Sequence, residues 1–353
     1  MAIFIKGFAL LLKMNNRTYR LTAALAGVLL SVSAMAQYGG KTAYNFMDIS
    51  GSARIYGLGG TNISTVDGDD IMTTDQNPAL LGPEMSRSIG VGYMRYVGGS
   101  NFASAKFAHA AGENGAWGIG LHYFGYGSIK TALPDGTLTG STSPMDMAFS
   151  AMYSHNLSAR WRGGIAVKFL YSSYAGYNAL AIATDLGVNY FDDELDSSLS
   201  LVVANLGGQV KKFHERADRL PIDVRLGWTK SIGTSPFYVN ITANNLTKWH
   251  MPYWKHDAKE GLGGVMVDNF FSNFFRHLVF GIEWKPTDSF YFDLAYNHRI
   301  KTDMATYSRN FLSGFSVGAG LKVRAFGISL AFAQPHKSAA TFMLNITTNL
   351  YDF

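Results

Sequence analysis

Few residues of this chain have the type and spacing that catalysis or metal binding requires. The acidic run Asp67-Gly68-Asp69-Asp70 could bind calcium, but Pro78 occupies the position that would supply the closing glutamate of an EF-hand loop. A solvated acidic turn is therefore the favoured interpretation. Gly57-Leu58-Gly59-Gly60 resembles a phosphate-binding loop only superficially, because no strand-then-helix unit surrounds it, and we expect its glycines to form turns.

The sequence gives little further support for nucleophilic catalysis or metal binding. The chain has nine histidines and no cysteine, which excludes disulfides and thiol chemistry. The histidines form no spaced pair on one element, apart from His250 and His256 in one loop, and no serine lies in a nucleophile motif. We therefore expect a protein that is not an enzyme and has no cofactor. A hydrolase whose triad is assembled from distant strands stays an open alternative.

The segment from Asn45 to Leu81 has the period of neither a helix nor a strand. Glycines and short polar residues interrupt it, and the Asn77-Pro78 step forces an extended or turn backbone near its end. Because irregular backbone at membrane depth is tolerated only inside protein, we interpret this segment as a hatch within a barrel. The hatch domain is predicted to span residues 37–87, and its characteristic positions are Gly57, Gly59, Gly60, Asn77, Pro78 and Ala79.

The start of the chain has the composition of a secretory signal peptide. Arg17 and Arg20 precede an apolar run from Leu21 to Val32, and Ala34-Met35-Ala36 supplies a small-residue cleavage site. The alternative is a membrane anchor, but about a dozen apolar residues are too few for a membrane-spanning helix. Residues 1–36, with Met14 as an alternative start, are predicted to be removed. The net charge of +5 then falls to +1, so no nucleic-acid binding is expected.

The remaining sequence alternates between apolar residues and small or polar ones, as two-faced β-strands do. We count about fourteen such strands, an even number typical of bacterial outer-membrane barrels. The predicted fold is all-β, a transmembrane antiparallel barrel at residues 88–353 with the hatch in its lumen. A soluble sandwich would have to hide the apolar faces under a second sheet. The predicted strands are 89–97, 102–110, 117–123, 145–153, 161–171, 180–190, 199–205, 222–228, 237–243, 278–284, 290–297, 315–324, 326–332 and 342–350.

Loop lengths orient this barrel. If the first strand rises from the periplasm, every periplasmic connection is short, and the long connections at 125–144, 207–220, 246–276 and 299–313 face outward. The outward-facing aromatic residues of many strands then form a girdle at the periplasmic ends. The lumen face is small and polar with scattered charges, which we expect to be ion-paired wall residues: Arg162, Lys168, Asp185, Asp223, Arg225, Glu283, Asp293 and Lys322.

The outer loop at 246–276 is rich in aromatic residues. Trp249, Tyr253 and Trp254 are of the type that anchors binding surfaces, so they are predicted to dock a partner; the alternative is a loop packed over its own barrel rim. Further on, apolar residues at helical spacing predict a short amphipathic helix that caps the barrel mouth, lines a ligand groove or receives a partner. Its apolar positions are Val267, Phe270, Phe271, Phe274, Phe275 and Leu278, of which Phe270, Phe271 and Phe274 are predicted to take part in docking.

Several of these motifs together resemble the PorV/PorQ branch of the FadL-like outer-membrane proteins. They are Ser52-Ala53-Arg54, the Gly57–Gly60 run, the Asp67–Asp70 run and Asn77-Pro78-Ala79-Leu80-Leu81, followed by about fourteen strands. Asn77-Pro78-Ala79 is the element shared with the FadL hatch. The aromatic opening from Tyr44 to Met47 and the chain length are closer to the PorQ members of the branch than to PorV.

The resemblance implies a non-enzymatic component of the type IX secretion system of Bacteroidetes. Its expected partners are PorZ, PorU and PorV, in the cell-surface complex that joins cargo to lipopolysaccharide, and its expected surroundings are the lipid and lipopolysaccharide of the outer membrane. The alternative is a FadL-like channel for hydrophobic small molecules. A channel requires a lateral opening or an apolar path past the hatch, whereas a docking barrel is blocked and carries its aromatic residues on the loop surface.

Overall fold

The computed structural model describes residues 42–65, 70–213, 217–256, 264–304, 311–336 and 339–352. The predicted signal peptide, the first residues of the predicted hatch domain and the Asp67–Asp69 part of the acidic run lie outside the described residues.

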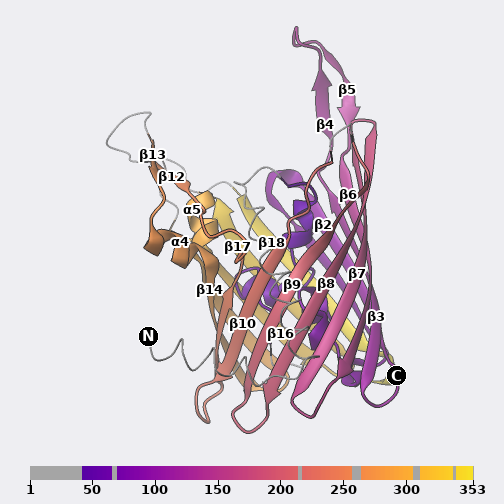
Figure 1. Cartoon of the computed structure of the whole chain (residues 1–353), viewed down its shortest axis with the longest axis vertical. Coiled ribbons are helices and arrows are strands. Elements are labelled where there is room, and N and C mark those ends of the chain that lie inside the picture. The colour runs from indigo at the N-terminus through magenta and orange to yellow at the C-terminus, as the bar shows by residue number, and fades with distance from the viewer. Residues whose placement is uncertain are drawn as a thin grey trace, which may run out of the picture. The chain divides into compact units, whose positions relative to one another are not determined.

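Fourteen strands form a closed antiparallel barrel in which β1 pairs with both β2 and β18 (Figure 1). The predicted all-β architecture is therefore confirmed. The barrel strands are β1 Ser88–Arg95, β2 Asn101–Ala110, β3 Gly115–Gly125, β6 Met145–Asn156, β7 Trp161–Tyr174, β8 Tyr177–Asp192, β9 Ser197–Lys211, β10 Asp223–Ser231, β11 Phe237–Ala243, β14 Leu278–Thr287, β15 Phe290–Asn297, β16 Phe315–Val323, β17 Phe326–His336 and β18 Ala339–Asn349.

The alternating sequence pattern places one apolar and one small or polar face on each strand. On β14, Phe280 and Ile282 are exposed on the outside, whereas Gly281 and Glu283 are buried in the lumen. Ile282 pairs with the equally exposed Leu294 of β15. The outer face is thus apolar across neighbouring strands, as a surface in contact with lipid must be.

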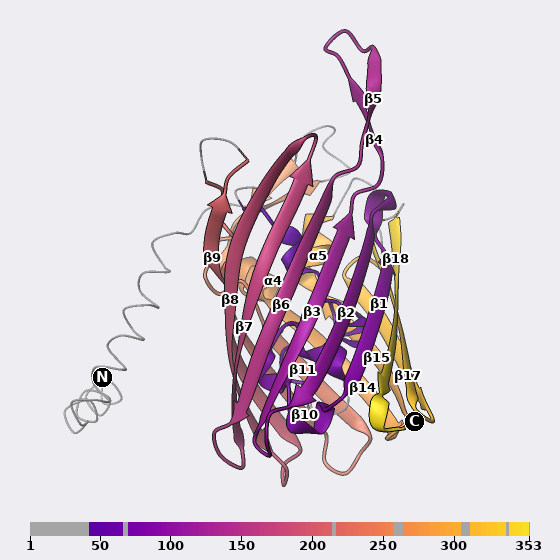
Figure 2. The same cartoon turned by 90° about the vertical axis from the view of Figure 1, so that its right-hand side faces the viewer.

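The two ends of the barrel differ as predicted. The turns at one end, called here the short-turn end, span 111–114, 157–160, 193–196, 232–236, 288–289 and 324–325. The opposite, long-loop end carries two hairpins and two short helices: β4 Ile129–Ala132 with β5 Leu138–Thr142, β12 Tyr253–His256 with β13 Gly264–Val267, α4 Phe270–His277 and α5 His298–Asp303. The β4–β5 hairpin projects beyond the barrel rim (Figure 2). The sequence pattern predicts loops at these positions and does not predict either hairpin.

The described residues contain no helix that is both long and apolar enough to cross a membrane.

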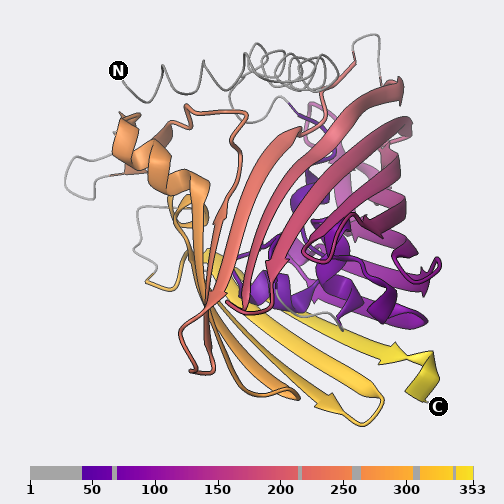
Figure 3. The same ribbon diagram turned by 60° about the horizontal axis from the view of Figure 1, so that its bottom comes forward.

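The hatch lies in the barrel lumen as a series of short helical turns (Figure 3). These are η1 Asn45–Asp48, α3 Ala53–Gly57, η2 Ile71–Asp75, η3 Pro78–Leu80 and η4 Pro83–Met85. The prediction of a segment without helices is wrong in this respect. Side-chain caps begin three of the turns, because Ser52 accepts a hydrogen bond from the Ile55 amide, Asp70 from Met72 and Asn77 from Ala79. Turns of three to five residues are too short to show a helical period.

Among the described residues, three apolar clusters pack the hatch against the wall, and the smallest joins Ile63 of the hatch to Val202 and Ala204 of β9. The cluster in the long-loop half joins Tyr44, Phe46 and Met47 of the hatch to wall residues that include Phe102 and Leu170. The cluster in the short-turn half joins Ile71, Met72, Leu81 and Met85 to small wall residues, among them Ala108, Ala116 and Ala166. The lumen is therefore a packed interior whose long-loop half is the more aromatic.

Candidate functional site

The hatch glycines have two different roles. Gly59 and Gly60 have φ angles of 92° and 82°, which favour glycine, so the predicted turn is present there. Gly57 is instead a point of close approach at the end of α3. A Cβ atom at Gly57 would lie 2.7 Å from the Cα atom of Gly318 on β16. The Gly57 carbonyl accepts a hydrogen bond from Ser316 Oγ at 2.8 Å. A larger residue at position 57 would push α3 off the wall.

Asn77, Pro78 and Ala79 lie against a flat patch of the wall. A Cβ atom at Gly164 of β7 would lie 2.4 Å from the Pro78 carbonyl carbon, and one at Gly187 of β8 would lie 2.2 Å from Asn77 Oδ1. Gly164 and Gly187 are directly paired across the ladder. Asn77 is fully buried, and its Nδ2 donates to the Ile63 carbonyl at 2.8 Å. This turn therefore requires both its own residues and two wall glycines.

A buried polar link between hatch and wall joins Arg54 of α3 to Glu283 of β14. The Arg54 Nε and Nη2 atoms lie 2.7 and 2.8 Å from the two Glu283 carboxylate oxygens, a bidentate geometry. The Arg54 side chain is only 1% exposed, and its guanidinium lies 4.6 Å from the Tyr291 ring centroid. Burial removes most of the solvent screening, so the arginine fixes α3 to β14 and β15.

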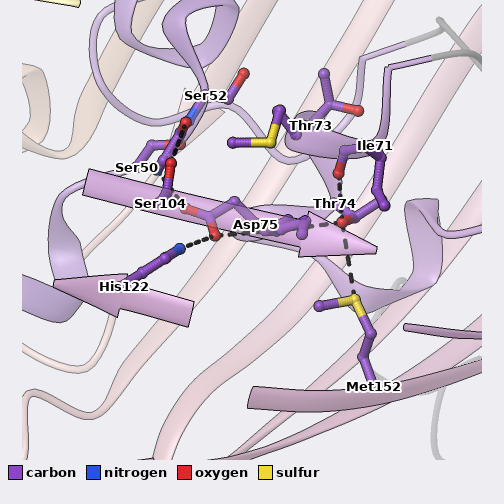
Figure 4. A network of polar contacts seen from close by, with 12 residues as sticks. Ser50, Ser52, Ile71, Thr73, Thr74, Asp75, Ser104, His122 and Met152 are labelled. Atoms are coloured by element: carbon purple, nitrogen blue, oxygen red, sulfur yellow. Dashed lines mark hydrogen bonds and ion pairs between the residues drawn. The ribbon is translucent and has the colours of Figure 1, made fainter. Parts of the chain in front are cut away.

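A second link centres on Asp75 at the end of η2 (Figure 4). One Asp75 oxygen lies 3.0 Å from Lys106 Nζ and 2.8 Å from His122 Nε2, and the other accepts a hydrogen bond from the Gly51 amide at 2.7 Å. Burial alone would raise the pKa of Asp75, but the charges of His122 and Lys106 and these hydrogen bonds hold the pKa well below its usual range. The carboxylate therefore stays charged at neutral pH.

Two further ion pairs join hatch and wall near the barrel ends. Asp48 of η1 lies 3.1 Å from Arg225 of β10, and Glu84 of η4 lies 2.8 Å from Arg162 of β7. Glu283, Arg162 and Arg225 are ion-paired wall residues, as predicted from the sequence. Glu283 and Arg162 pair with the hatch, and Arg225 pairs both with the hatch and with Asp223 of the wall, the latter at 2.7 Å. These wall charges hold the hatch in place.

Asp293 of β15 differs from the other lumen charges. It is directly opposite Glu283 in the β14–β15 ladder and fully buried. Neither of its carboxylate oxygens has a hydrogen-bond partner among the described residues. Two acidic groups directly opposite each other are an unfavourable arrangement, so the binding of Arg54 to Glu283 is important to this contact.

The wall contains a seam, defined here as the stretch without strand pairing between the long-loop part of β9 (205–211) and the chain before β10 (217–222). Pairing between β9 and β10 stops at Ala204 and Asp223, whereas β9 continues to Lys211 along β8. The strand predicted at 199–205 is therefore too short, because Gly207-Gly208 has the composition of a loop. At the junction Asn205 has a φ of 60°, and its backbone N–H donates a hydrogen bond to Asp185 Oδ1 at 2.8 Å.

The end of the β9–β10 ladder is held by a buried ion pair. Lys168 Nζ lies 2.6 Å from Asp185 and 3.1 Å from the Asn205 side-chain oxygen. Asn205 Nδ2 in turn donates to the Pro221 carbonyl across the seam at 3.1 Å. The β8–β9 ladder has a bulge opposite Asp185, and these three polar side chains fix it where β9 separates from β10. The seam is therefore a built feature of the wall.

The start of the hatch segment covers the seam from within. The Ala43 amide donates to the Arg219 carbonyl at 2.9 Å, and Gln209 Oε1 accepts from the Asp218 amide at 2.7 Å. Tyr44 and Leu220 are both 4% exposed and belong to the apolar cluster of the long-loop half. Apolar side chains therefore separate the seam from the lumen.

The predicted docking residues gather at the long-loop end, at the outer ends of β11 and β14. Trp249 is 40% exposed, and its ring stacks on His277 with centroids 5.2 Å apart. Trp254 on β12 is 58% exposed. Tyr253 is only half-buried rather than exposed, because the Arg276 guanidinium lies over its ring at 4.9 Å. The two tryptophans are thus available to a partner, whereas the tyrosine supports the rim.

Helix α4 carries the other three predicted docking residues, Phe270, Phe271 and Phe274. It begins at Phe270, not at Val267, because Asn269 caps it by accepting a hydrogen bond from the Ser272 amide at 2.8 Å and Val267 belongs to β13. All three phenylalanines are at least 41% exposed. A docking role for these residues stays a prediction.

No group of three or more potential metal ligands occurs among the described residues. His250 lies 3.4 Å from Asp268. Asp70, the described member of the predicted acidic turn, caps η2. Arg54, Asp75 and His122 are hatch-fixing residues that the sequence does not predict, since each of them pairs with a residue far away in the chain.

Comparison with known proteins gives a likeness of fold. No family model matches the sequence, and no curated protein matches it. Among solved structures, the toluene transporter TbuX of Ralstonia pickettii is 12% identical, with 85% of this chain and 97% of that chain covered and a TM-score of 0.51. The toluene transporter TodX of Pseudomonas putida is 13% identical, with 85% and 97% covered and a TM-score of 0.52. The monoaromatic hydrocarbon channel CymD is 12% identical, with 86% and 97% covered and a TM-score of 0.50.

These neighbours are barrels of the FadL type. Their low sequence identity limits the likeness to the fold, which agrees with the apolar outer face and the short turns at one end of the barrel. Together the fold and that outer face are those of an outer-membrane protein. The chain thus has the fold of the FadL-type outer-membrane barrels, closed by an N-terminal hatch.

Proposed function

We propose that the chain is a hatch-gated channel for small hydrophobic compounds, with the seam between β9 and β10 as its lateral portal. The seam carries this proposal, because it interrupts the ladder of an otherwise closed wall beside the most apolar part of the lumen. The titles of the structural neighbours describe hydrocarbon transporters and channels. Their likeness favours this function over the alternative given below.

A path for such a compound would run from the apolar cluster past the hatch. Tyr44 and Leu220 cover the seam, and displacement of these two side chains would join it to the lumen cluster. At the short-turn end, a cavity of about 200 Å³ lies between the hatch and β15–β18, lined by polar residues that include Arg54, Tyr291 and Ser329. This cavity would lead a released compound to the periplasm.

The seam can be tested by two substitutions with opposite expected effects. A Cβ atom at Gly208 would meet no atom within 4 Å, so this position on the β9 side of the seam has room for the start of a side chain, and Gly208→Trp adds a large ring there. Leu220→Ala instead removes apolar cover from its inside. Toluene uptake by cells that lack other hydrocarbon channels should fall severalfold with Gly208→Trp and rise with Leu220→Ala.

Thr139→Trp is the matched control for these variants, because Thr139 is an exposed residue of the β4–β5 hairpin, outside the seam. All three variants should migrate faster on gels when unheated, as intact barrels do. Equal toluene uptake by the wild type, Gly208→Trp and Leu220→Ala would contradict the portal and leave the hatch as a fixed plug.

The second candidate is a docking component of the type IX secretion system, as the sequence resemblance to the PorV/PorQ branch, and to PorQ in particular, implies. One observation favours it: Trp249 and Trp254 are exposed at the long-loop end, above a lumen filled by an ion-paired hatch. Exposed tryptophans are common anchors of protein interfaces. PorZ, PorU and PorV would be the partners.

Removal of both tryptophans tests the docking function. Truncation of an aromatic hot spot costs about 2 kcal/mol or more of binding free energy, so the Trp249→Ala, Trp254→Ala variant should lose most of its co-purifying secretion proteins in a Bacteroidetes host. Thr131→Ala with Thr139→Ala, on the β4–β5 hairpin, is the control. Normal partner recovery and cargo attachment, together with reduced hydrocarbon uptake, would exclude docking in favour of the channel.

A further inference from the structure

Helix α4 is amphipathic with its polar side turned inward. Asn273 donates to Asp268 Oδ1 at 2.7 Å and accepts from the Met251 amide at 3.2 Å, and Arg276 binds Asp303 at 2.6 Å. His277 lies 2.8 Å from the Asn244 carbonyl oxygen. These three polar residues are at most 4% exposed. The phenylalanines of the helix show the opposite: Phe270 is 63% exposed, Phe271 72%, Phe274 41% and Phe275 46%.

The wall below α4 is short for a membrane-spanning barrel. Strand β11 has seven residues, whereas a transmembrane strand requires about 9–11. On β14, the outward-facing residues Trp284, Ile282 and Phe280 lead up to Leu278, where α4 ends and the strand begins. With a rise of roughly 3.3 Å per residue and a tilt of about 40°, the distance from Trp284 to Leu278 corresponds to about 15 Å along the membrane normal.

The apolar band of an outer-membrane barrel is about 25 Å tall. If the band begins at the aromatic residues of the short-turn end, such as Trp284, about 10 Å of it remains above Leu278. An α-helix with its side chains is about 10–12 Å across. The exposed phenylalanines of α4 therefore continue the lipid-facing surface of β14 at the height where that strand ends.

We propose that α4 completes the lipid-facing wall, with Phe270, Phe271, Phe274 and Phe275 among the acyl chains of the outer leaflet. Continuity with the apolar face of β14 identifies lipid as the occupant, and the inverted polarity of the helix explains why its buried side is the hydrogen-bonded one. The inference is independent of the proposed channel. It assigns lipid contact to three residues that the sequence pattern suggested for partner docking.

The chain has no cysteine, so single-cysteine variants can be labelled at one site. Phe271→Cys and Phe274→Cys, each carrying a nitroxide, would be refolded as the mature chain into vesicles of phosphatidylcholine and phosphatidylglycerol. Collision rates with oxygen, which concentrates in lipid, and with the water-soluble complex NiEDDA would then be measured by electron paramagnetic resonance. At both positions we expect oxygen collisions to exceed NiEDDA collisions.

Two control positions calibrate the result. Leu294→Cys reports the lipid-facing middle of β15, and Thr139→Cys reports the exposed β4–β5 hairpin. The proposal requires the label at 271 or 274 to behave as the label at 294 does, in samples whose gel mobility shows a folded barrel. A preference for NiEDDA at both 271 and 274, as at 139, would overturn it and leave these phenylalanines as a surface for a protein partner.

Discussion

Replacement of Arg54 by alanine is expected to release the hatch from the wall while the barrel still assembles. Removal of one partner from a buried ion pair costs about 3–5 kcal/mol, because the other charge is left uncompensated. Here the loss leaves Glu283 opposite Asp293 without the arginine that binds Glu283. The predicted result is a large increase in outer-membrane permeability to vancomycin, measured as sensitivity of cells, with heat-modifiable gel mobility unchanged.

Two further variants separate charge from geometry at this contact. Arg54→Lys keeps the charge but loses the bidentate hydrogen bonds, so its effect should be intermediate. Asp293→Asn removes a buried carboxylate that has no hydrogen-bond partner among the described residues, and it should leave the hatch as firm as in the wild type or firmer. If Arg54→Ala cells resisted vancomycin as wild-type cells do, the Asp75 and Asp48 contacts would be sufficient to hold the hatch.

The barrel could be predicted from the sequence because its signal is local and repeated. In β14 and β15, every second residue is large and apolar, and a period of two has one structural meaning in a strand. Strand ends were less certain where glycine occurs on the ladder. Gly207 and Gly208 extend β9 along β8, but as glycines they have the composition of a loop.

The contacts of the hatch could not be predicted in the same way. Arg54 and Glu283 are 229 positions apart, and Asp75 reaches Lys106 and His122 on two different strands. Such pairs depend on how the hatch is rotated within the lumen, which no periodic pattern records. The sequence does show that the lumen is lined by small residues, and Gly164, Gly187 and Gly318 are among the positions where the hatch lies close against the wall.

Helix α4 illustrates a different limit. The spacing of its phenylalanines predicts an amphipathic helix, and one is present. In a water-soluble protein the apolar side of such a helix packs inward. At the rim of a lipid-facing barrel this rule does not hold, and hydrogen bonds to Asn273, Arg276 and His277 turn the polar side inward instead. The spacing of apolar residues predicts the helix, whereas the surrounding solvent determines which side of the helix faces inward.

Leu294→Arg is expected to have the second large effect, because it tests whether the apolar outer face contacts lipid. Leu294 lies in the middle of β15, is 44% exposed and pairs with Ile282 and Val317 on neighbouring strands. Arginine at the bilayer midplane of a barrel costs about 2–4 kcal/mol of unfolding free energy, falling to about 0–1 near the interfaces. Denaturant titration in lipid vesicles should show this loss.

Val323→Arg is the matched control, since Val323 is equally exposed but lies at the short-turn end of β16, next to Arg324. Ala295 would be a poor control, because it is 2% exposed and a Cβ atom on Gly59 of the hatch would lie 3.5 Å from it. A lipid-facing wall requires the loss at position 294 to exceed the loss at 323 by about 1 kcal/mol or more. Equal losses at the two positions would mean that the apolar face of β15 does not lie at the centre of a bilayer.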